Sequence, residues 1–264
     1  MYREDNNCDA AKLWNFLDSK EGENRCGITE CKFIDAHYKM WDDIIECTLS
    51  YGGCGFVDSC ASGGGRNDLE SMRRGVPLLR SDFDRTTIAI RLSMTTSFNK
   101  WIPFCGALSK EKPHQTASKG ISDKYVWRAS YLPVLNVSSQ FVQDPLLDFD
   151  ILRFGINEWK KVNSLLMKDF YVLTPWKNKD TNDSLIAYSF FDSEKNNGII
   201  LAFRQEECKE EKLTISLPYV KDNERITLTD EDTDKKYVIE DNKIELLFDK
   251  PRTARLLWVN KEEI

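Results

Sequence analysis

Residues 58–84 read DSCASGGGRNDLESMRRGVPLLRSDFD, and they set the order of elements in the first half of the chain. The apolar pair Phe56-Val57 comes just before them and favours a short buried strand. Within them, Asp68–Arg74 favours a brief helix and Val76–Leu79 favours a second buried strand. A strand, a helix and another strand in this order are typical of parallel βα units.

The upstream sequence continues this alternation with two helices. Asp9–Lys20 favours a short helix, and Thr29 is expected to cap a longer one. That helix should end near Tyr51-Gly52-Gly53, because glycine commonly terminates helices. Its apolar residues recur at helical spacing, at Ile34, Tyr38, Trp41 and Ile45.

The downstream sequence adds two more helices with strands between them. Helices are expected at Thr86–Phe98 and at about 149–166, and strands at Trp101–Phe104 and Tyr131–Val137. The polar stretch Ser109–Ile121 is expected to form a surface loop.

From about Phe170 the pattern changes to short runs in which apolar and polar residues alternate. Seven such runs are SLIAYSFF, GIILAFR, KLTISLP, RITLT, KYVIE, KIELLF and TARLLWV. Turn sequences such as Asn-Asn-Gly separate them. They predict a small antiparallel β-sandwich, with a domain boundary near 165–172.

Composition excludes several classes of function. The chain has 264 residues, of which 41% are hydrophobic and 30% are charged, as in an ordinary globular protein. A net charge of −6 argues against a nucleic-acid partner. There is no apolar run of about 18 residues, so we expect no transmembrane helix and no membrane partner.

The eight cysteines are scattered and form no CxxC pair, and there are only two histidines. Neither a zinc site nor a disulfide framework is therefore predicted. We expect reduced thiols and a cytoplasmic location. A signal peptide on a preceding segment is not excluded by this pattern.

Asp5 and Asp82 are the candidate catalytic carboxylates, and they come from separate segments. In βα units functional residues gather at the carboxyl ends of the strands, and Asp82 follows Val76–Leu79. Two opposed carboxylates are what hydrolysis of a glycosidic bond needs. Taken singly, an aspartate after a strand is more often a helix cap or a solvated residue. The run Ser62-Gly63-Gly64-Gly65 lacks the lysine and hydroxyl residue that follow in a nucleotide site.

Several motifs together resemble the bacterial α-galactosidases of glycoside hydrolase family 36. They are CASGGGR followed by RSD, an upstream R-x-D-x-N element, and a GITE segment. The resemblance continues through WIPF, EWKKV, DFYVLTP and TARLLWV. It implies that residues 1–168 are the C-terminal portion of a (β/α)₈ TIM-type barrel. Residues 169–264 would be the C-terminal antiparallel β-sandwich.

The resemblance also implies an activity, the retaining hydrolysis of terminal α-galactosides such as raffinose-type or melibiose-type oligosaccharides. Asp5 falls on the family's nucleophile and Asp82 on its general acid/base. No metal or organic cofactor is implied. Retention requires the two carboxyl groups to lie about 5–5.5 Å apart.

Five further residues fall on substrate-binding positions of the family. Arg3 and Asn7 flank the nucleophile, and Arg3 would hold sugar hydroxyls. Cys60 and Gly63 would line the sugar near its 2-position. Arg66 matches the motif arginine, which orients nearby carboxylates.

The sequence departs from the family at Asn6, usually an apolar residue, and at Asp58-Ser59. The family's large N-terminal β-domain and first barrel strands have no counterpart here, which implies a fragment of a longer enzyme. One alternative is a catalytically inactive truncated homologue that needs a partner or the missing N-terminal half, and a homo-oligomer is another way to cover an open half barrel. A further alternative keeps the chemistry but acts on α-N-acetylgalactosaminides.

Overall fold

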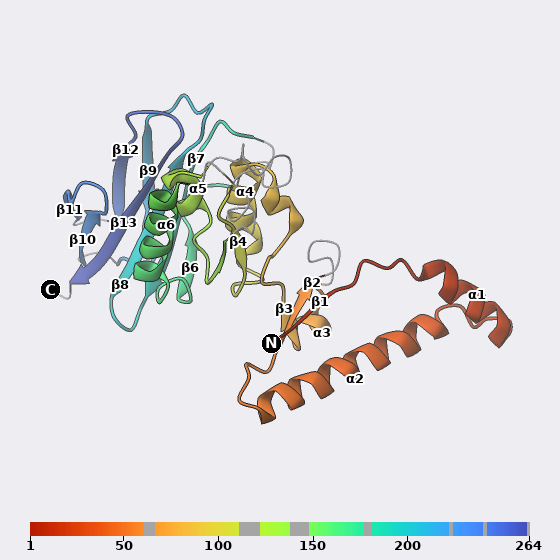
Figure 1. The fold of residues 1–264 in the computed structure, drawn as a ribbon. Coiled ribbons are helices and arrows are strands. Elements are labelled where there is room, and N and C mark those ends of the chain that lie inside the picture. Colours follow the sequence, from red (N-terminus) through yellow and green to blue (C-terminus); the bar gives the residue numbers. More distant parts are fainter. Residues whose placement is uncertain are drawn as a thin grey trace. The chain divides into compact units, whose positions relative to one another are not determined.

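The computed structural model describes residues 1–60, 67–110, 122–137, 148–176, 181–221, 224–239 and 242–262. Contacts divide the chain into two compact units, Met1–Asp82 (unit 1) and Phe83–Ile264 (unit 2). Figure 1 colours the chain from red at the N-terminus to blue at the C-terminus.

A three-stranded parallel sheet in the order β1-β2-β3 organises unit 1 (Figure 1). Its strands are β1 Tyr2–Asp5, β2 Val57–Cys60 and β3 Gly75–Val76. The predicted strand at 76–79 is shorter and begins earlier, because Pro77 has no N–H to extend the ladder. The short helix α3 Leu69–Met72 connects β2 to β3, which confirms the predicted order of strand, helix and strand.

Two helices, α1 Ala11–Glu21 and α2 Ile28–Ser50, lie between β1 and β2 in the chain. The predicted end of α2 is confirmed, but Thr29 is not its cap. The N-cap is Gly27, in the left-handed region at φ 89°. Asp18 on α1 does the capping: its carboxylate accepts hydrogen bonds from the backbone N–H groups of Gly27 (2.6 Å) and Thr29 (2.9 Å).

Asp18→Asn is expected to destabilise unit 1 at neutral pH. Hydrogen bonds from the Thr29 side chain and from the backbone of Thr29 and Gly27 lower the Asp18 pKa, although burial opposes them. A carboxyl whose pKa is depressed by folding contributes stability above its unfolded pKa of about 3.9, and this contribution is lost as pH falls through the folded pKa.

Urea unfolding followed by circular dichroism from pH 7 down to pH 2 measures this effect. The difference between wild type and Asp18→Asn should be largest at neutral pH and should shrink in acid. Asp35→Asn, at an exposed position of α2, is the matched control and should show little effect at any pH. A wild type and Asp18→Asn pair with equal stability at pH 7 would contradict the capping role.

Unit 2 begins with helices that alternate with two short parallel strands. These elements are α4 Ile88–Phe98, β4 Gly106–Leu108, α5 Lys124–Ala129, β5 Val134–Asn136 and α6 Phe149–Val162. The predicted strand at 101–104 is wrong. The backbone N–H groups of Trp101 and Ile102 donate to the Phe98 carbonyl and close the end of α4, and Pro103 has no N–H for a ladder. The strand that pairs with β5 starts at Gly106 instead.

The remainder of unit 2 is built from antiparallel strands in the described residues; all seven predicted strands are confirmed, and one further strand, Asp169–Val172, precedes them. The strands are β6 Asp169–Val172, β7 Leu185–Asp192, β8 Asn197–Arg204, β9 Lys212–Ser216, β10 Arg225–Asp230, β11 Lys236–Ile239, β12 Lys243–Leu247 and β13 Thr253–Glu262. Six of them form a sheet in the order β11-β10-β13-β8-β7-β6, and β12 pairs with β9.

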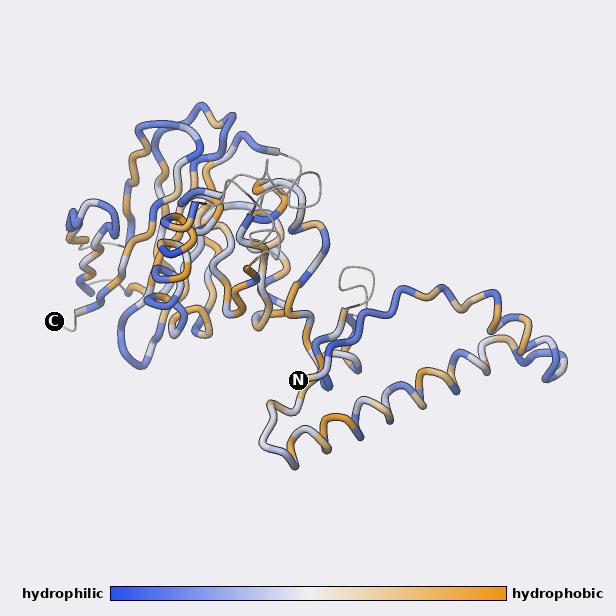
Figure 2. Tube along the Cα trace, in the orientation of Figure 1, coloured by the Kyte–Doolittle hydropathy of each residue, from blue (hydrophilic) through white to orange (hydrophobic). Residues whose placement is uncertain are grey.

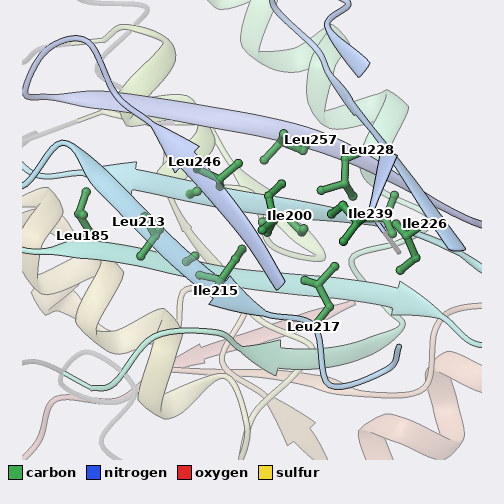
Figure 3. Packing of buried hydrophobic residues seen from close by; sticks show 14 of the residues in the cluster. Leu185, Ile200, Leu213, Ile215, Leu217, Ile226, Leu228, Ile239, Leu246 and Leu257 are labelled. Atoms are coloured by element: carbon green, nitrogen blue, oxygen red, sulfur yellow. The ribbon is translucent and has the colours of Figure 1, made fainter. Parts of the chain in front are cut away.

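A hydrophobic core lies between these two sheets. In β9 and β12 buried and exposed residues alternate strictly, which is the period-2 pattern that the sequence predicts. Figure 3 shows Leu213 and Leu246 from the small sheet and Ile200 and Leu257 from the large sheet within one cluster. The inward residues of both sheets thus share one apolar layer.

The opposite face of the large sheet is covered by α5 and α6. Tyr125 on α5 packs edge-on against Phe203 of β8, with ring centroids 5.7 Å apart. Arg128 is fully buried, forms an ion pair with Glu158 on α6 at 2.7 Å, and donates to the Ala254 carbonyl in β13 at 2.9 Å. Because both faces are covered, β7 is buried along its whole length.

Gly155→Ala is expected to destabilise unit 2 by about 1–3 kcal/mol or more, because the new methyl group would overlap the buried Trp127 ring. Asn157→Ala on the exposed side of α6 is the matched control, and alanine's helix propensity should leave stability equal or slightly raised. Thermal unfolding of the two variants and of wild type measures the difference. Equal melting temperatures would show that the ring can move aside.

The parallel strands form two sheets in the described residues, β1-β2-β3 in unit 1 and β4-β5 in unit 2. A partial barrel over 1–168 stays a prediction, as does the domain boundary at 168/169. Within the described part of the chain, no helix combines the length and apolarity needed to span a bilayer.

Candidate functional site

Strand β1 presents different chemistry on its two faces, because successive side chains in a strand point in opposite directions. Arg3 and Asp5 lie on one face. Glu4 lies on the other and is buried, where its carboxylate accepts a hydrogen bond from the Trp41 indole at 2.8 Å. The other Glu4 oxygen lies 3.2 Å from His37 Nε2. The Glu4 side therefore fastens β1 to α2, while the Arg3 side faces the candidate site.

Arg3 links β1 to β2 through Asp58. Its Nη1 donates to Asp58 Oδ2 at 2.5 Å, and the other Asp58 oxygen accepts from the Leu78 backbone N–H at 3.0 Å. Asp58 is buried, so its two partners hold the carboxylate in a fixed orientation. The position of Arg3 is thus set by a buried anion on the neighbouring strand.

Asp5 ends β1 directly opposite Cys60, the last residue of β2. Its Oδ2 lies 3.5 Å from Arg3 Nη2, and its Oδ1 accepts from the Asn7 amide at 3.0 Å. About half of the Asp5 side chain is exposed, at 48%. A half-exposed carboxylate beside a cation and an amide donor is suited to act as a nucleophile.

The charge on Arg3 is secured by its surroundings. Partial burial acts to lower the pKa of Arg3, but the hydrogen bond to Asp58 and the negative charges of Asp58 and Asp5 outweigh it, so the pKa lies above its ordinary value. Arg3 therefore stays a cation beside Asp5 throughout the physiological range.

Cys60 is buried at the carboxyl end of β2 and is a free thiol. The other predicted residues of this loop, Gly63 and Arg66, lie outside the described residues. All eight cysteines are free, and the described residues contain no cluster of His, Cys, Asp and Glu side chains arranged to hold a metal.

Asp82 follows β3 in the chain and opens the 3-10 helix at Asp82–Arg85. Its side chain is exposed. Because β1, β2 and β3 are parallel, the chain leaves all three strands at the same edge of the sheet. The structure thus brings Arg3, Asp5, Asn7 and Cys60 together, whereas Asp82 lies beyond the end of β3, in the 3-10 helix, and its proximity to Asp5 stays a prediction.

Sequence reasoning missed three contributors to this arrangement. Asp58 was noticed only as a departure from the family, yet it anchors Arg3. Glu4 and His37 were not singled out, although they attach the strand to α2. The available signal was alternation: in the run Tyr2–Asp5, a carboxylate between two site residues must point to the opposite face.

Comparison with solved structures identifies what this fold is similar to. The galactosidase domain of an α-galactosidase–sucrose kinase matches 83% of this chain and 31% of its own length, with a TM-score of 0.60 and 18% identity. A family 36 α-galactosidase from Geobacillus stearothermophilus, solved with 1-deoxygalactonojirimycin, matches 78% of this chain with a TM-score of 0.57 and 16% identity. The α-galactosidase from Lactobacillus brevis matches 83%, with a TM-score of 0.58 and 16% identity.

The chain therefore has the fold of part of the solved family 36 α-galactosidases. It spans about three tenths of their length, at 29%, 30% and 31% of the three chains. No protein-family profile matches the chain, and no curated protein matches it.

Proposed function

We propose that this chain carries the two catalytic carboxylates of a retaining α-galactosidase, with Asp5 as nucleophile and Asp82 as general acid/base. The observation that carries the proposal is the setting of Asp5. It lies at the carboxyl end of a parallel strand and contacts Arg3 and Asn7, in a chain that has the fold of part of the family 36 α-galactosidases.

The reaction runs in two displacements. Asp5 attacks the anomeric carbon of a terminal α-galactoside while Asp82 donates its proton to the leaving oxygen, and a covalent galactosyl-Asp5 ester forms. Asp82, now a carboxylate, removes a proton from water as the water attacks the same carbon. This attack breaks the ester bond, releases galactose with retained configuration and returns both groups to their starting states.

Arg3 and Asn7 support the first step. A cation beside one Asp5 oxygen and an amide donor on the other orient the carboxylate for attack on the sugar. The free donors of Arg3 would bind substrate hydroxyls. Cys60 and Gly63 would line the 2-position of the sugar. Cys60 favours a plain 2-hydroxyl there, and therefore galactosides over α-N-acetylgalactosaminides. Arg66 would orient the acidic groups.

Unit 1 supports the view that further polypeptide completes the active enzyme. Parallel sheets occur almost only with both faces covered, and β1 is an edge strand in the described sheet. Several large apolar side chains on α1 and α2 are exposed, and Figure 2 shows hydrophobic stretches recurring along α2. These exposed residues are Leu13, Phe16, Leu17, Phe33, Ile34 and Met40. The proposed cover is the preceding part of a barrel, within a longer chain or on a separate one.

The direct test is hydrolysis of p-nitrophenyl α-galactoside. The purified chain is assayed alone and together with a separately expressed segment that carries the preceding barrel strands of a family 36 enzyme. We expect turnover when the two are combined, and weaker turnover with p-nitrophenyl α-N-acetylgalactosaminide. Release of α-galactose as the first product, followed by NMR, establishes retention.

The competing function is a non-catalytic remnant that only supports a partner. It predicts that the two pieces associate, as judged by size-exclusion chromatography, but release no nitrophenol. That pair of results would overturn the catalytic proposal.

A further inference from the structure

Asp58 occupies the centre of the three-stranded sheet of unit 1. It lies on the middle strand, β2, directly opposite Arg3 on β1 and Val76 on β3. Residues at paired positions of neighbouring strands point to the same face of a sheet, so the Asp58 side chain lies on the face that carries Arg3 and Asp5. A buried carboxylate in the middle of this row can act on both neighbouring strands.

Each Asp58 oxygen has its own partner. Oδ2 accepts a hydrogen bond from Arg3 Nη1 at 2.5 Å, and Oδ1 accepts one from the Leu78 backbone N–H at 3.0 Å. The first partner lies beside Asp5. The second belongs to the segment that leads from the end of β3 to Asp82. One carboxylate therefore holds both the side chain that contacts Asp5 and the backbone that leads to Asp82.

Arg3 is shared unequally between two carboxylates. Its Nη2 lies 3.5 Å from Asp5 Oδ2, a longer contact than the one that Nη1 makes with Asp58. The Asp58 side chain is 5% exposed and the Asp5 side chain is 48% exposed, so water screens the attraction to Asp5 more strongly. The buried carboxylate thus keeps the guanidinium from closing a two-pronged ion pair with Asp5. A carboxylate in such a pair is a weaker nucleophile, because part of its charge is already neutralised.

We propose that Asp58 is a positioning residue for both candidate catalytic carboxylates. It holds Arg3 away from a tight pair with Asp5. It also fixes the start of the segment that carries Asp82. This inference rests on the proposed function, because it concerns the reaction at that same site. The two contacts, here the Arg3 arm and the Leu78 arm, are separable because each uses a different Asp58 oxygen.

Asp58→Asn breaks the Arg3 arm alone. The amide keeps one acceptor oxygen for the Leu78 N–H, whereas its NH₂ group is a donor and cannot accept a hydrogen bond from Arg3. The full chain is assayed with its complementing segment, in single turnovers of p-nitrophenyl α-galactoside and of raffinose. We expect the rate constant of the first step to fall by the same factor for both substrates, about tenfold to a hundredfold.

Asp58→Ala breaks both arms. Its loss should be larger with raffinose, which has a poor leaving group, than with the aryl galactoside, because displacement of Asp82 weakens protonation of the leaving oxygen. Equal losses for the two substrates would remove the Leu78 arm from the proposal.

A double-mutant cycle isolates the Arg3 arm. If Asp58 acts on Asp5 through Arg3, then in an Arg3→Met background Asp58→Asn should slow the first step by no more than about twofold. Losses that simply add in this cycle would contradict the Arg3 arm.

Asp18→Asn is the matched control for a loss of stability. Asp18 is also a buried carboxylate of unit 1 with two backbone hydrogen bonds, but it makes them at the start of α2. It should keep wild-type rates with both substrates at temperatures where the chain stays folded. A slowed first step in this variant would show that reduced stability of unit 1 is enough to explain the Asp58 results.

Hydrogen exchange followed by NMR supplies a readout that needs no turnover. In the full chain alone, Asp58→Ala should hasten exchange of the Leu78 amide by at least about tenfold, whereas Asp58→Asn should leave it near the wild-type rate. Unchanged exchange in Asp58→Ala would overturn the Leu78 arm, whether or not the chain hydrolyses galactosides.

The variants also separate failure of this inference from failure of the proposed function. If Asp58→Asn and Asp58→Ala keep wild-type rates while Asp5→Asn and Asp82→Ala lose turnover, the positioning role is wrong and the proposed function stands. If the wild-type pair shows no turnover, the proposed function fails, and the catalytic role inferred for Asp58 fails with it.

Discussion

Asp5→Asn is expected to reduce turnover of p-nitrophenyl α-galactoside by at least about a thousandfold, which corresponds to ~4 kcal/mol of transition-state stabilisation. An amide cannot form the glycosyl ester, but it keeps nearly the same shape and can still contact Arg3 and Asn7. The loss should therefore fall on kcat and leave KM little changed. The measurement uses the preparation that is active with its complementing segment.

Covalent labelling tests the same residue without steady-state kinetics. An activated 2-deoxy-2-fluoro galactoside should add one sugar mass to the chain, and peptide mapping should place it on Asp5. Asp9→Asn, at an exposed carboxylate in the segment that follows β1, should keep both labelling and turnover. Wild-type rates in Asp5→Asn, or labelling on another carboxylate, would remove Asp5 from the nucleophile's role.

Asp82→Ala should depend strongly on the leaving group. With a poor leaving group such as a second sugar, loss of the general acid is expected to slow cleavage by about a hundredfold to ten-thousandfold. An activated aryl galactoside leaves without protonation, so its first step should survive and a galactosyl enzyme should accumulate. Azide attacks without needing a base, and it should raise the rate and yield α-galactosyl azide.

The configuration of that azide discriminates between mechanisms. Retention requires the two carboxyl groups about 5–5.5 Å apart, whereas about 6.5–9.5 Å leaves room for a water and inversion. A β-galactosyl azide, or no rescue with the activated substrate, would contradict the role given to Asp82. Asp35→Ala, at an exposed position of α2, is the control: its rates should match those of wild type with both kinds of leaving group, with and without azide.

The antiparallel strands were predictable because their signal is local. In β9 and β12 each side chain is either in the core or in solvent, so the sequence itself carries the period of the strand. The cap of α2 was not predictable in this way. Thr29 has the usual chemistry of a cap, but Asp18 reaches the helix end from another helix, and no short-range pattern records such a contact.

The same distinction between local patterns and long-range contacts applies to the candidate site. Arg3, Asp5 and Asn7 follow from a compact motif, and in the structure Asp5 contacts both Arg3 and Asn7. Asp58 contributes by accepting a hydrogen bond from Arg3, which lies 55 positions earlier in the chain. No local sequence pattern records a contact over that separation. The wrong strand at 101–104 had the opposite cause, since an apolar run was mistaken for a strand where the backbone was still closing α4.

Strand β1 has only four residues, so a rotation at one of them is carried to the others. The rotation of β1 about its axis is fixed by the contacts of Glu4 with Trp41 and His37. If these contacts weaken, the strand can rotate and the Asp5 side chain rotates with it. Substitutions on the buried side of α2 should consequently change the aim of a carboxylate that they never touch.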